Sequence, residues 1–168
     1  MTVFDLRGVR VRSGEEHREA VDVSIAPIEL GGERYVAVPE HVPAELSVTR
    51  ASTGLVLGLR LSVRLHGPCM RCLGDAALDE TLALREYQAT SPDSDELTMP
   101  YLADDRLDLS AWARDALILA LPDKILCRQD CAGLCPACGR DLNAEPHTHD
   151  ADEGDPRWAA LEQLKERL

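Results

Sequence analysis

The stretch C-RQD-C-AGL-C-PA-C-GRDLNAEP-H-T-H, from Cys127 to His149, organises the interpretation of the whole chain. It places four cysteines within twelve residues and adds two histidines shortly afterwards. Thiolate and imidazole groups at short, turn-compatible spacings are the ligands that tetrahedral zinc takes in proteins. Between Cys135 and Cys138, Pro136 stiffens the turn, and the following Gly139 lets the backbone approach the sulfurs. The stretch therefore predicts a cysteine-rich zinc-binding segment.

The other two cysteines form a second CxxC far upstream, and two divisions of the eight candidate ligands fit the spacing. In the first division, one ion is bound by Cys69, Cys72, Cys127 and Cys131, and a second by Cys135, Cys138, His147 and His149. In the other division, Cys69 and Cys72 join Cys135 and Cys138, and the remaining cysteines are free or weakly bound. We favour the first because it uses every ligand, so we expect one or two structural zinc ions per chain.

Length, composition and charge limit the domain size, the kind of core and the kind of partner. The 168 residues are enough for one domain with a core, and aromatic residues make up only 4%, so the core must be built from Leu, Val, Ala and Ile. The formal charge of −12 argues against broad electrostatic binding of nucleic acid and suits a basic partner. We see no signal peptide and no apolar run long enough to cross a membrane. A cytoplasmic location is expected, where six cysteines favour metal over disulfides.

Alternating residues predict an antiparallel sheet. From Leu55 to Leu65, apolar residues recur at every second position, which is typical of a strand with one buried face. Its expected partner is residues 46–51, joined through a hairpin at 52–54. The strand runs directly into the first CxxC, and a further strand, 77–89, leaves from the other side of that turn. Short strands are also plausible around 21–25 and 36–38.

Helices are expected after the strands. Asp108 is a candidate N-cap for a helix that ends at Pro122, and a last helix is expected to start at Asp155. The acidic residues 91–108 are interpreted as a solvated loop. The predicted fold is α+β, an antiparallel sheet with a few C-terminal helices and the zinc-binding segment. It forms a single domain, 1–168, with a poorly defined part at 1–44, strands and a CxxC at 45–90, and the helices and zinc segment at 108–168.

Charges are segregated along the chain. Residues 54–73 contain three arginines and no acid, and three more basic residues lie near the cysteines, whereas acids concentrate at 91–108 and 141–155. This pattern suggests one surface for a basic protein and one for RNA phosphates. The candidate RNA contacts are Arg60, Arg64, Arg71, Lys124, Arg128 and Arg140.

Several motifs resemble the YceD family of large ribosomal RNA subunit accumulation proteins. They are the C-x-R-C-L motif at 69–73, L-A-L-P at 119–122, and C-x3-C-x-G-L-C-x-x-C-G-x-x-L-N at 127–143, with D-P-R-W-A-A-L at 155–161. The resemblance spans about residues 40–168. Many members end the long motif with C-x-C, where this chain has His147-Thr148-His149. The resemblance implies a role in 23S ribosomal RNA accumulation and assembly of the large subunit, with rRNA, a pre-50S particle or a basic ribosomal protein as partner.

Three functional hypotheses follow. The leading one is a non-enzymatic assembly factor, because four protein ligands leave zinc no open position for a substrate or water. The alternative is a thiol redox protein that uses Cys69 and Cys72, although a redox CxxC usually opens a helix after a parallel strand. A zinc nuclease is the third, and the sequence shows neither a base nor an open metal position for it.

Overall fold

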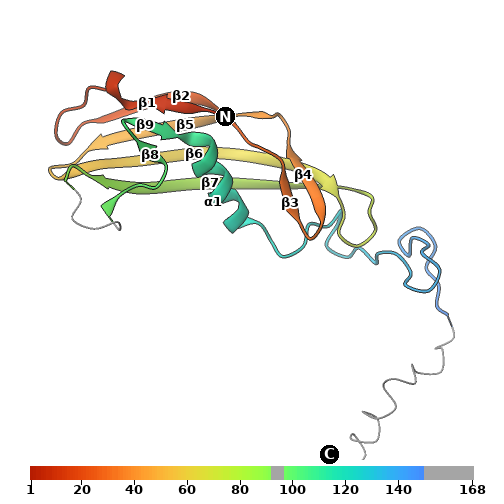
Figure 1. Cartoon of the computed structure of the whole chain (residues 1–168). Helices are drawn as coiled ribbons and strands as arrows, with labels where there is room; N and C mark the ends of the chain where they lie inside the picture. The colour runs from red at the N-terminus through yellow and green to blue at the C-terminus, as the bar shows by residue number, and fades with distance from the viewer. Residues whose placement is uncertain (92–96, 150–168) are drawn as a thin grey trace, which may run out of the picture. The chain divides into compact units, whose positions relative to one another are not determined.

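A computed structural model describes residues 1–91 and 97–149 of the chain. Its contacts divide the chain into two compact units, Met1–Cys131 and Ala132–Leu168, which are treated separately below. Figure 1 shows the elements of the first unit. The single-domain organisation stays a prediction. Within the described residues, no helix is long and apolar enough to cross a membrane.

The first unit is built on a six-stranded sheet in which every neighbouring pair is antiparallel. Its strands follow the order β2-β5-β6-β4-β3, and β7 pairs with β6 as well. Their bounds are β2 Glu16–Ser24, β3 Ile28–Leu30, β4 Glu33–Ala37, β5 His41–Arg50, β6 Gly54–Pro68 and β7 Asp75–Ala89.

A smaller three-stranded sheet pairs the N-terminal strand with the segment before α1, in the order β1-β9-β8. It consists of β1 (Val3–Asp5), β8 (Leu102–Ala103) and β9 (Arg106–Asp108), and a 3-10 helix, η1 (Leu6–Gly8), follows β1. β9 leads directly into α1 (Leu109–Ala120). The interpretation of 97–108 as a loop was therefore wrong in part: strands this short carry too few residues to show a period of two.

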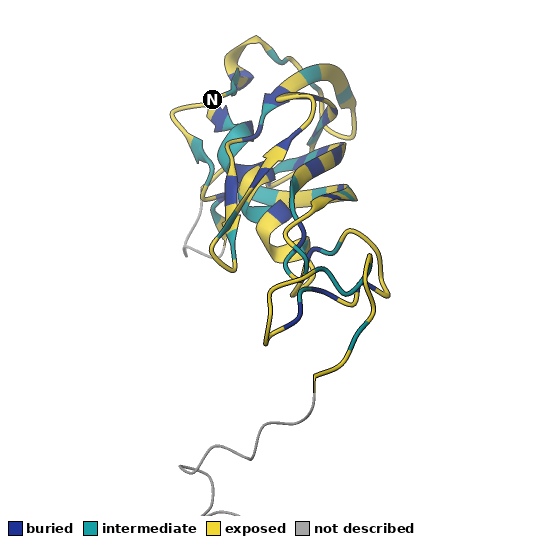
Figure 2. Ribbon diagram, turned by 90° about the vertical axis from the view of Figure 1, so that its right-hand side faces the viewer, coloured by how far each residue is buried: buried dark blue, intermediate teal, exposed yellow. Residues whose placement is uncertain are grey.

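The β6–β7 hairpin is the longest feature of the fold. Its register runs without interruption from the pair Gly54–Ala89 to the pair Pro68–Asp75. The alternation predicted for residues 55–65 is confirmed, since the apolar residues from Leu57 to Leu65 are buried and the intervening residues from Arg60 onwards are exposed. Figure 2 shows this alternation of buried and exposed residues across the strands. The predicted hairpin with β5 is confirmed by the pairing of Arg50 with Leu55.

The core lies between the sheet and α1. Trp112 and Leu117 of α1 are buried and belong to the same apolar cluster as Leu46, Leu57 and Leu59 of the sheet. Full burial of a leucine stabilises the folded state by about 1.5–3 kcal/mol, so these contacts fix the helix on the sheet. The predicted N-cap is confirmed, because Asp108 Oδ1 accepts a hydrogen bond of 3.0 Å from the Ala111 amide.

The structure differs from two predictions, one about further helices and one about the N-terminal part. The described residues contain one α-helix, so the expectation of a few C-terminal helices is not supported, and the helix expected from Asp155 lies outside those residues. Residues 1–44 are not poorly defined: they form β1 to β4 and the start of β5. Pro27, the pair Gly31-Gly32 and Pro39 lie between these strands, whereas Pro43 lies within β5.

In the second unit, residues 132–149 form neither a helix nor a strand. An isolated antiparallel bridge joins Leu134 to Asp141, and the Leu142 amide donates to the Gly133 carbonyl at 2.9 Å. Among residues 132–149 only Gly133 and Cys135 are buried, so this segment has little apolar core, and its cysteines and histidines are the main candidates for holding it together.

Candidate metal centres

The first candidate centre lies in the first unit, at the end of the β6–β7 hairpin. Cys69 and Cys72 occupy the turn between these strands, and Cys127 and Cys131 come from the segment after α1. One ligand atom from each of the four lies within 4.8 Å of the others. The sulfurs of Cys69 and Cys131 are 3.8 Å apart, and those of Cys72 and Cys127 are 3.7 Å apart.

These distances fit a metal-bound set of thiolates. Four sulfurs placed about 2.3 Å from one zinc ion at tetrahedral angles are separated by about 3.8 Å. A disulfide would bring two sulfurs to about 2.05 Å, and all six cysteines are free. Both the donor type and the spacing of this group therefore suit a four-coordinate zinc ion.

Backbone hydrogen bonds shape the turn that carries the first two sulfurs. The Cys69 amide donates to the Gly74 carbonyl at 2.7 Å, and the Leu73 amide donates back to the Cys69 carbonyl at 2.9 Å. Leu73 adopts a left-handed φ of 61° to close this turn. The neighbouring Met70 amide donates to the Ile125 carbonyl at 2.9 Å, which ties the turn to the chain just before Cys127. The two cysteine pairs are thus brought together by main-chain contacts as well as by the sulfurs.

Arg71 supports the same centre through its side chain. Its Nη1 donates to the Cys131 carbonyl at 2.7 Å, and its amide donates to Cys69 Sγ at 3.5 Å. Burial raises the pKa of the Cys69 thiol, but backbone hydrogen bonds from Cys72 and its neighbours more than offset this and bring the pKa to about 6. Desolvation and the adjacent sulfurs raise the pKa of Cys127 to about 12. One thiol of the group is thereby prepared as a thiolate.

The second candidate centre lies within the second unit and has two sulfur and two imidazole donors. Ligand atoms of Cys135, Cys138, His147 and His149 lie within 4.8 Å of one another. Cys138 Sγ is 3.1 Å from His147 Nε2, and the two imidazole rings meet edge to face with centroids 5.0 Å apart. A Cys₂His₂ set is one of the ligand sets that structural zinc takes.

The turn at Cys135 has the same hydrogen bonds as the turn at Cys69. The Cys135 amide donates to the Arg140 carbonyl at 2.8 Å, and the Gly139 amide donates to the Cys135 carbonyl at 2.8 Å. Gly139 has a φ of 73°, a conformation that costs glycine nothing. Backbone donation from Cys138 lowers the pKa of the Cys135 thiol to about 6. Each centre therefore combines a zinc-knuckle turn with one thiol held as a thiolate near neutral pH.

A hydrogen bond assigns the proton of His147. Its Nδ1 lies 2.7 Å from the Glu145 carbonyl oxygen. A carbonyl can only accept, so Nδ1 carries the proton and the lone pair of Nε2 points toward Cys138. The same contact raises the pKa of His147. Fixing one ring nitrogen by a carbonyl is the usual support for a metal-binding histidine.

The structure groups the eight residues as in the first of the two divisions drawn from the sequence. Both groups can hold a metal ion, and binding of zinc by either stays a prediction. The sequence did not reveal the support from Arg71, whose side chain crosses to a residue sixty positions away.

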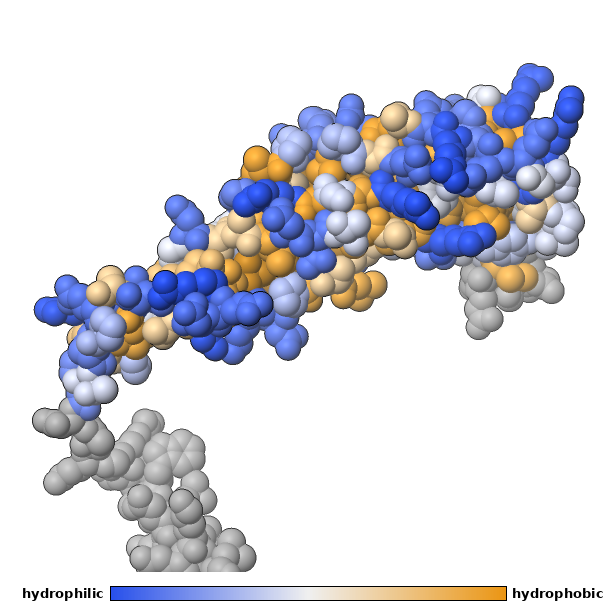
Figure 3. Space-filling view, turned by 180° about the vertical axis from the view of Figure 1, so that it is seen from behind, coloured by the Kyte–Doolittle hydropathy of each residue, from blue (hydrophilic) through white to orange (hydrophobic). Residues whose placement is uncertain are grey.

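Four of the six candidate RNA contacts have partners within the fold, and RNA binding by the six stays a prediction. Arg64 pairs with Asp79 at 3.7 Å, Arg128 with Asp130 at 3.3 Å, and Arg140 with Glu145 at 3.2 Å. Arg71 donates a hydrogen bond to the Cys131 carbonyl in the first metal centre. Lys124 is exposed in the segment after α1, and Arg140 belongs to the second unit. Seen from behind in Figure 3, hydrophilic side chains are spread over the molecule with hydrophobic areas between them.

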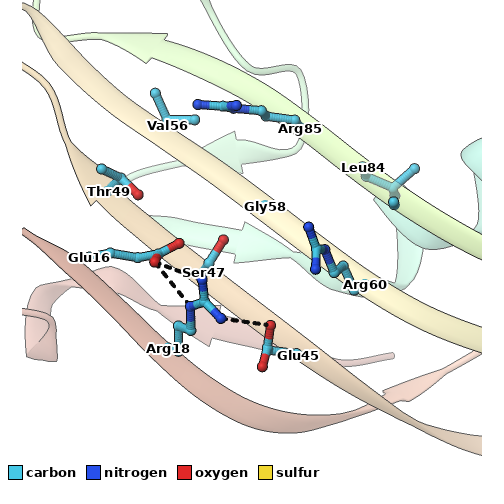
Figure 4. A pocket seen from close by; sticks show the side chains of 11 residues that line it. Glu16, Arg18, Glu45, Ser47, Thr49, Val56, Gly58, Arg60, Leu84 and Arg85 are labelled. Atoms are coloured by element: carbon cyan, nitrogen blue, oxygen red, sulfur yellow. Dashed lines mark hydrogen bonds and ion pairs between the residues drawn. The ribbon is translucent and has the colours of Figure 1, made fainter.

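Arg60 lies on a different kind of surface. It projects from β6 beside Gly58, and Arg85 of β7 lies on the other side of that glycine (Figure 4). Within the described residues, neither guanidinium has an ion pair or hydrogen bond, whereas Arg18 on the same face pairs with Glu16 and Glu45. The depression between them has a volume of about 270 Å³. Arg85 was missed, although its place opposite Gly58 follows once the hairpin register is known.

The comparisons with known proteins cover both centres. A family model described as large ribosomal RNA subunit accumulation protein YceD matches residues 57–165. Uncharacterized proteins of Mycobacterium bovis and Mycobacterium tuberculosis are each 35% identical over 154 residues, covering 87% of this chain and 73% of each relative. An uncharacterized protein of Mycobacterium leprae is 32% identical over 123 residues, covering 70% of this chain and 56% of that protein. No solved structure matches the chain.

Proposed function

The chain belongs to the YceD family, and from this premise we propose that it is a non-enzymatic zinc-binding factor in biogenesis of the large ribosomal subunit. The family name itself implies a role in accumulation of large-subunit ribosomal RNA. The proposal adds a molecular basis: two structural zinc ions shape the protein, and the shaped protein binds rRNA or a basic ribosomal protein. Its place of action would be the cytoplasm, on the pre-50S particle.

The grouping of the eight ligands is the observation that carries the zinc proposal. Sulfurs 3.7 and 3.8 Å apart in the first centre suit four thiolates around one ion. In the second centre, the proton on Nδ1 of His147 leaves Nε2 available as a ligand. Zinc bound at these sites would supply folding energy, which matters most for residues 132–149 because they have few backbone pairs.

A structural role suits these sites better than a catalytic one. Four protein ligands complete the tetrahedron of a zinc ion, so no position is left for water or substrate. The redox alternative needs an accessible thiolate, and although the pKa of Cys69 is about 6, its side chain is fully buried. Burial of this sulfur favours a ligand over a nucleophile.

A complementation experiment tests the proposal. A strain that lacks the gene is supplied with the wild-type chain, the variant Cys69→Ser with Cys72→Ser, or the variant Cys72→His. The ratio of 23S to 16S rRNA and the zinc content of the purified protein are measured. We expect the double serine variant to fail in both, and Cys72→His, which replaces the thiol at that position with another zinc ligand, to retain part of both.

The two variants separate the hypotheses. If Cys72→His binds zinc and yet fails as completely as the double serine variant, thiol chemistry is required and the structural role is wrong. If the wild-type protein contains no zinc after purification under reducing, metal-replete conditions, the zinc proposal is wrong. If loss of the gene leaves the rRNA ratio unchanged, the ribosomal role is wrong.

A further inference from the structure

The free edge of β7 is a feature that the metal centres do not explain. Within the described residues, β7 pairs with β6 and with no strand on its other side, and it lies at the margin of the sheet in Figure 1. The strand is fifteen residues long, and its register with β6 contains no bulge. A long, regular edge presents unpaired amide and carbonyl groups, and proteins usually protect such an edge.

A groove follows this edge beside α1. It has a volume of about 520 Å³ and is bounded by Thr81 to Glu86 of β7 and by side chains of α1 that include Trp112 and Leu119. Residues from both faces of β7 line it, which places the groove on the edge itself. Leu119 is 87% exposed and adds an apolar side chain to its rim.

The side chains of β7 that point toward α1 follow a symmetric pattern. Leu82 and Leu84 stand opposite the buried Leu61 and Leu59 of β6, and Glu80 and Glu86 flank the two leucines at the next positions on that face. The order on the groove side is therefore acid, leucine, leucine, acid. A strand added to this edge would meet the same order of side chains whether it ran parallel or antiparallel to β7.

Charge opposes a second copy of β7 paired so that the leucines of the two strands meet. In an antiparallel pairing of two copies centred on Ala83, Glu80 of one chain would face Glu86 of the other, at both ends of the pairing. Like charges directly opposite each other on neighbouring strands are destabilising. The same two carboxylates attract basic side chains at those positions.

We propose that the free edge of β7 binds an extended basic peptide segment by strand addition. The segment carries two apolar residues in alternation, which cover Leu82, Leu84 and Leu119, and a Lys or Arg two positions beyond each, which meets Glu80 or Glu86. Main-chain hydrogen bonds supply affinity and the alternating side chains supply specificity. The inference rests on the proposed function for its cellular setting and names the partner class as a basic protein.

Peptide titration tests this directly, with the full chain as the receptor. The probe is a fluorescently labelled peptide of sequence Lys-Thr-Val-Thr-Val-Thr-Lys, followed by anisotropy at low and high salt. A peptide with both Lys replaced by Glu, and one of the same composition without the alternation, should not bind. N-methylation of every residue of the peptide should abolish binding, because whichever edge of the peptide pairs with β7 then lacks amide donors.

Matched protein variants separate this edge from bulk charge. Glu80→Lys with Glu86→Lys should weaken binding of the Lys peptide by about tenfold or more and allow the Glu peptide to bind. Asp75→Lys with Asp79→Lys changes the net charge equally on the same strand but on the opposite face, and should have little effect. Leu119→Ser, at an exposed position, should weaken binding by about tenfold without changing the thermal unfolding curve.

Three outcomes would overturn the inference: equal losses in the two charge variants, binding that survives N-methylation of every peptide residue, or tight binding of a single-stranded RNA that the Lys peptide competes away. The titration contains no ribosomes, so its failure leaves the proposed ribosomal role standing. Conversely, an unchanged rRNA ratio in the deletion strain would refute that role while the peptide result remained.

Discussion

Leu73 and Gly139 occupy equivalent positions in the two cysteine turns. Each follows the second cysteine of a CxxC, each has a left-handed φ (61° and 73°), and each donates its amide to the carbonyl of the first cysteine at 2.9 and 2.8 Å. The left-handed region costs a residue with a β-carbon about 1–2 kcal/mol and costs glycine nothing. The second turn is therefore free of a strain that the first turn carries.

We predict that Gly139→Ala weakens zinc binding at the second centre by about 1 kcal/mol, or roughly fivefold, because only the backbone conformation opposes the new methyl group. No atom lies within 4 Å of the β-carbon that this substitution would add, so crowding plays no part. Competition with a chromogenic chelator measures the affinity. Gly8→Ala is the control, since it also meets open space but at an ordinary φ, and it should bind zinc normally. Equal affinities in all three proteins would contradict the strain argument.

Removal of one cysteine pair should remove one ion and leave the other. Cys69→Ser with Cys72→Ser should also lower the unfolding temperature of the sheet, because Cys69 and Cys131 belong to the main apolar cluster. Cys135→Ser with Cys138→Ser should lose the same amount of metal and leave that transition almost unchanged. Elemental analysis and calorimetry on the same samples measure both effects. Loss of all zinc in either variant would show that the ligands are divided differently.

Zinc affinity should fall with acidity, and the pKa values set the range. Zinc binds thiolates, so protons compete with it wherever the thiols are protonated. Near pH 7, Cys69 and Cys135 are already largely ionised because the pKa of each is about 6, and below that pH both bind a proton. We expect zinc release to become steep as the pH drops through about 6. Release that does not change with pH across this range would exclude thiolate ligands.

Gly67 has no room for a side chain, and it lies just before the first cysteine turn. A β-carbon there would lie 2.8 Å from the Arg34 carbonyl oxygen and against the ring of Tyr35, which is fully buried. Tyr35 in turn donates its hydroxyl proton to the Pro68 carbonyl at 2.8 Å. Gly67→Ala should therefore destabilise the first unit by about 1–3 kcal/mol and loosen its zinc. Gly8→Ala serves as the calorimetric control, and an unchanged unfolding temperature in Gly67→Ala would show that the sheet yields at this point.

The sequence could predict what repeats over many residues. The alternation from Leu55 to Leu65 predicted β6 and its buried face, and the Asp108 cap predicted the start of α1. Strands of two or three residues, such as β8 and β9, carry no period and could not be found that way.

Side-chain partners were harder to predict than strands. Arg64 and Arg71 were grouped as RNA contacts because they lie in a stretch without acids. In the fold, Arg64 faces Asp79 across the hairpin and Arg71 reaches Cys131. Neighbours in space that are distant along the chain decide whether an arginine is available, and only the folded structure reveals them.

The last prediction concerns two arginines of the sheet for which the described residues provide no ion pair. Arg60 and Arg85 flank Gly58 and line the same depression of the sheet, in which the Ser47 hydroxyl occupies the space above the glycine (Figure 4). An RNA phosphate between two guanidinium groups would accept charge-assisted hydrogen bonds from both. If this face contacts rRNA, Arg60→Glu with Arg85→Glu should weaken binding of a single-stranded rRNA fragment. The slope of the logarithm of the binding constant against the logarithm of the salt concentration should fall by about two ions.

The matched control is Arg18→Glu with Arg64→Glu, which makes the same charge change on the same face. Those two arginines already pair with carboxylates, so their reversal should weaken RNA binding less. Filter binding across a salt series measures the affinity and its salt dependence for both variants, and circular dichroism checks that they fold. Equal losses in the two variants would mean that RNA responds only to net charge, and no loss in either would remove this face from the RNA contact.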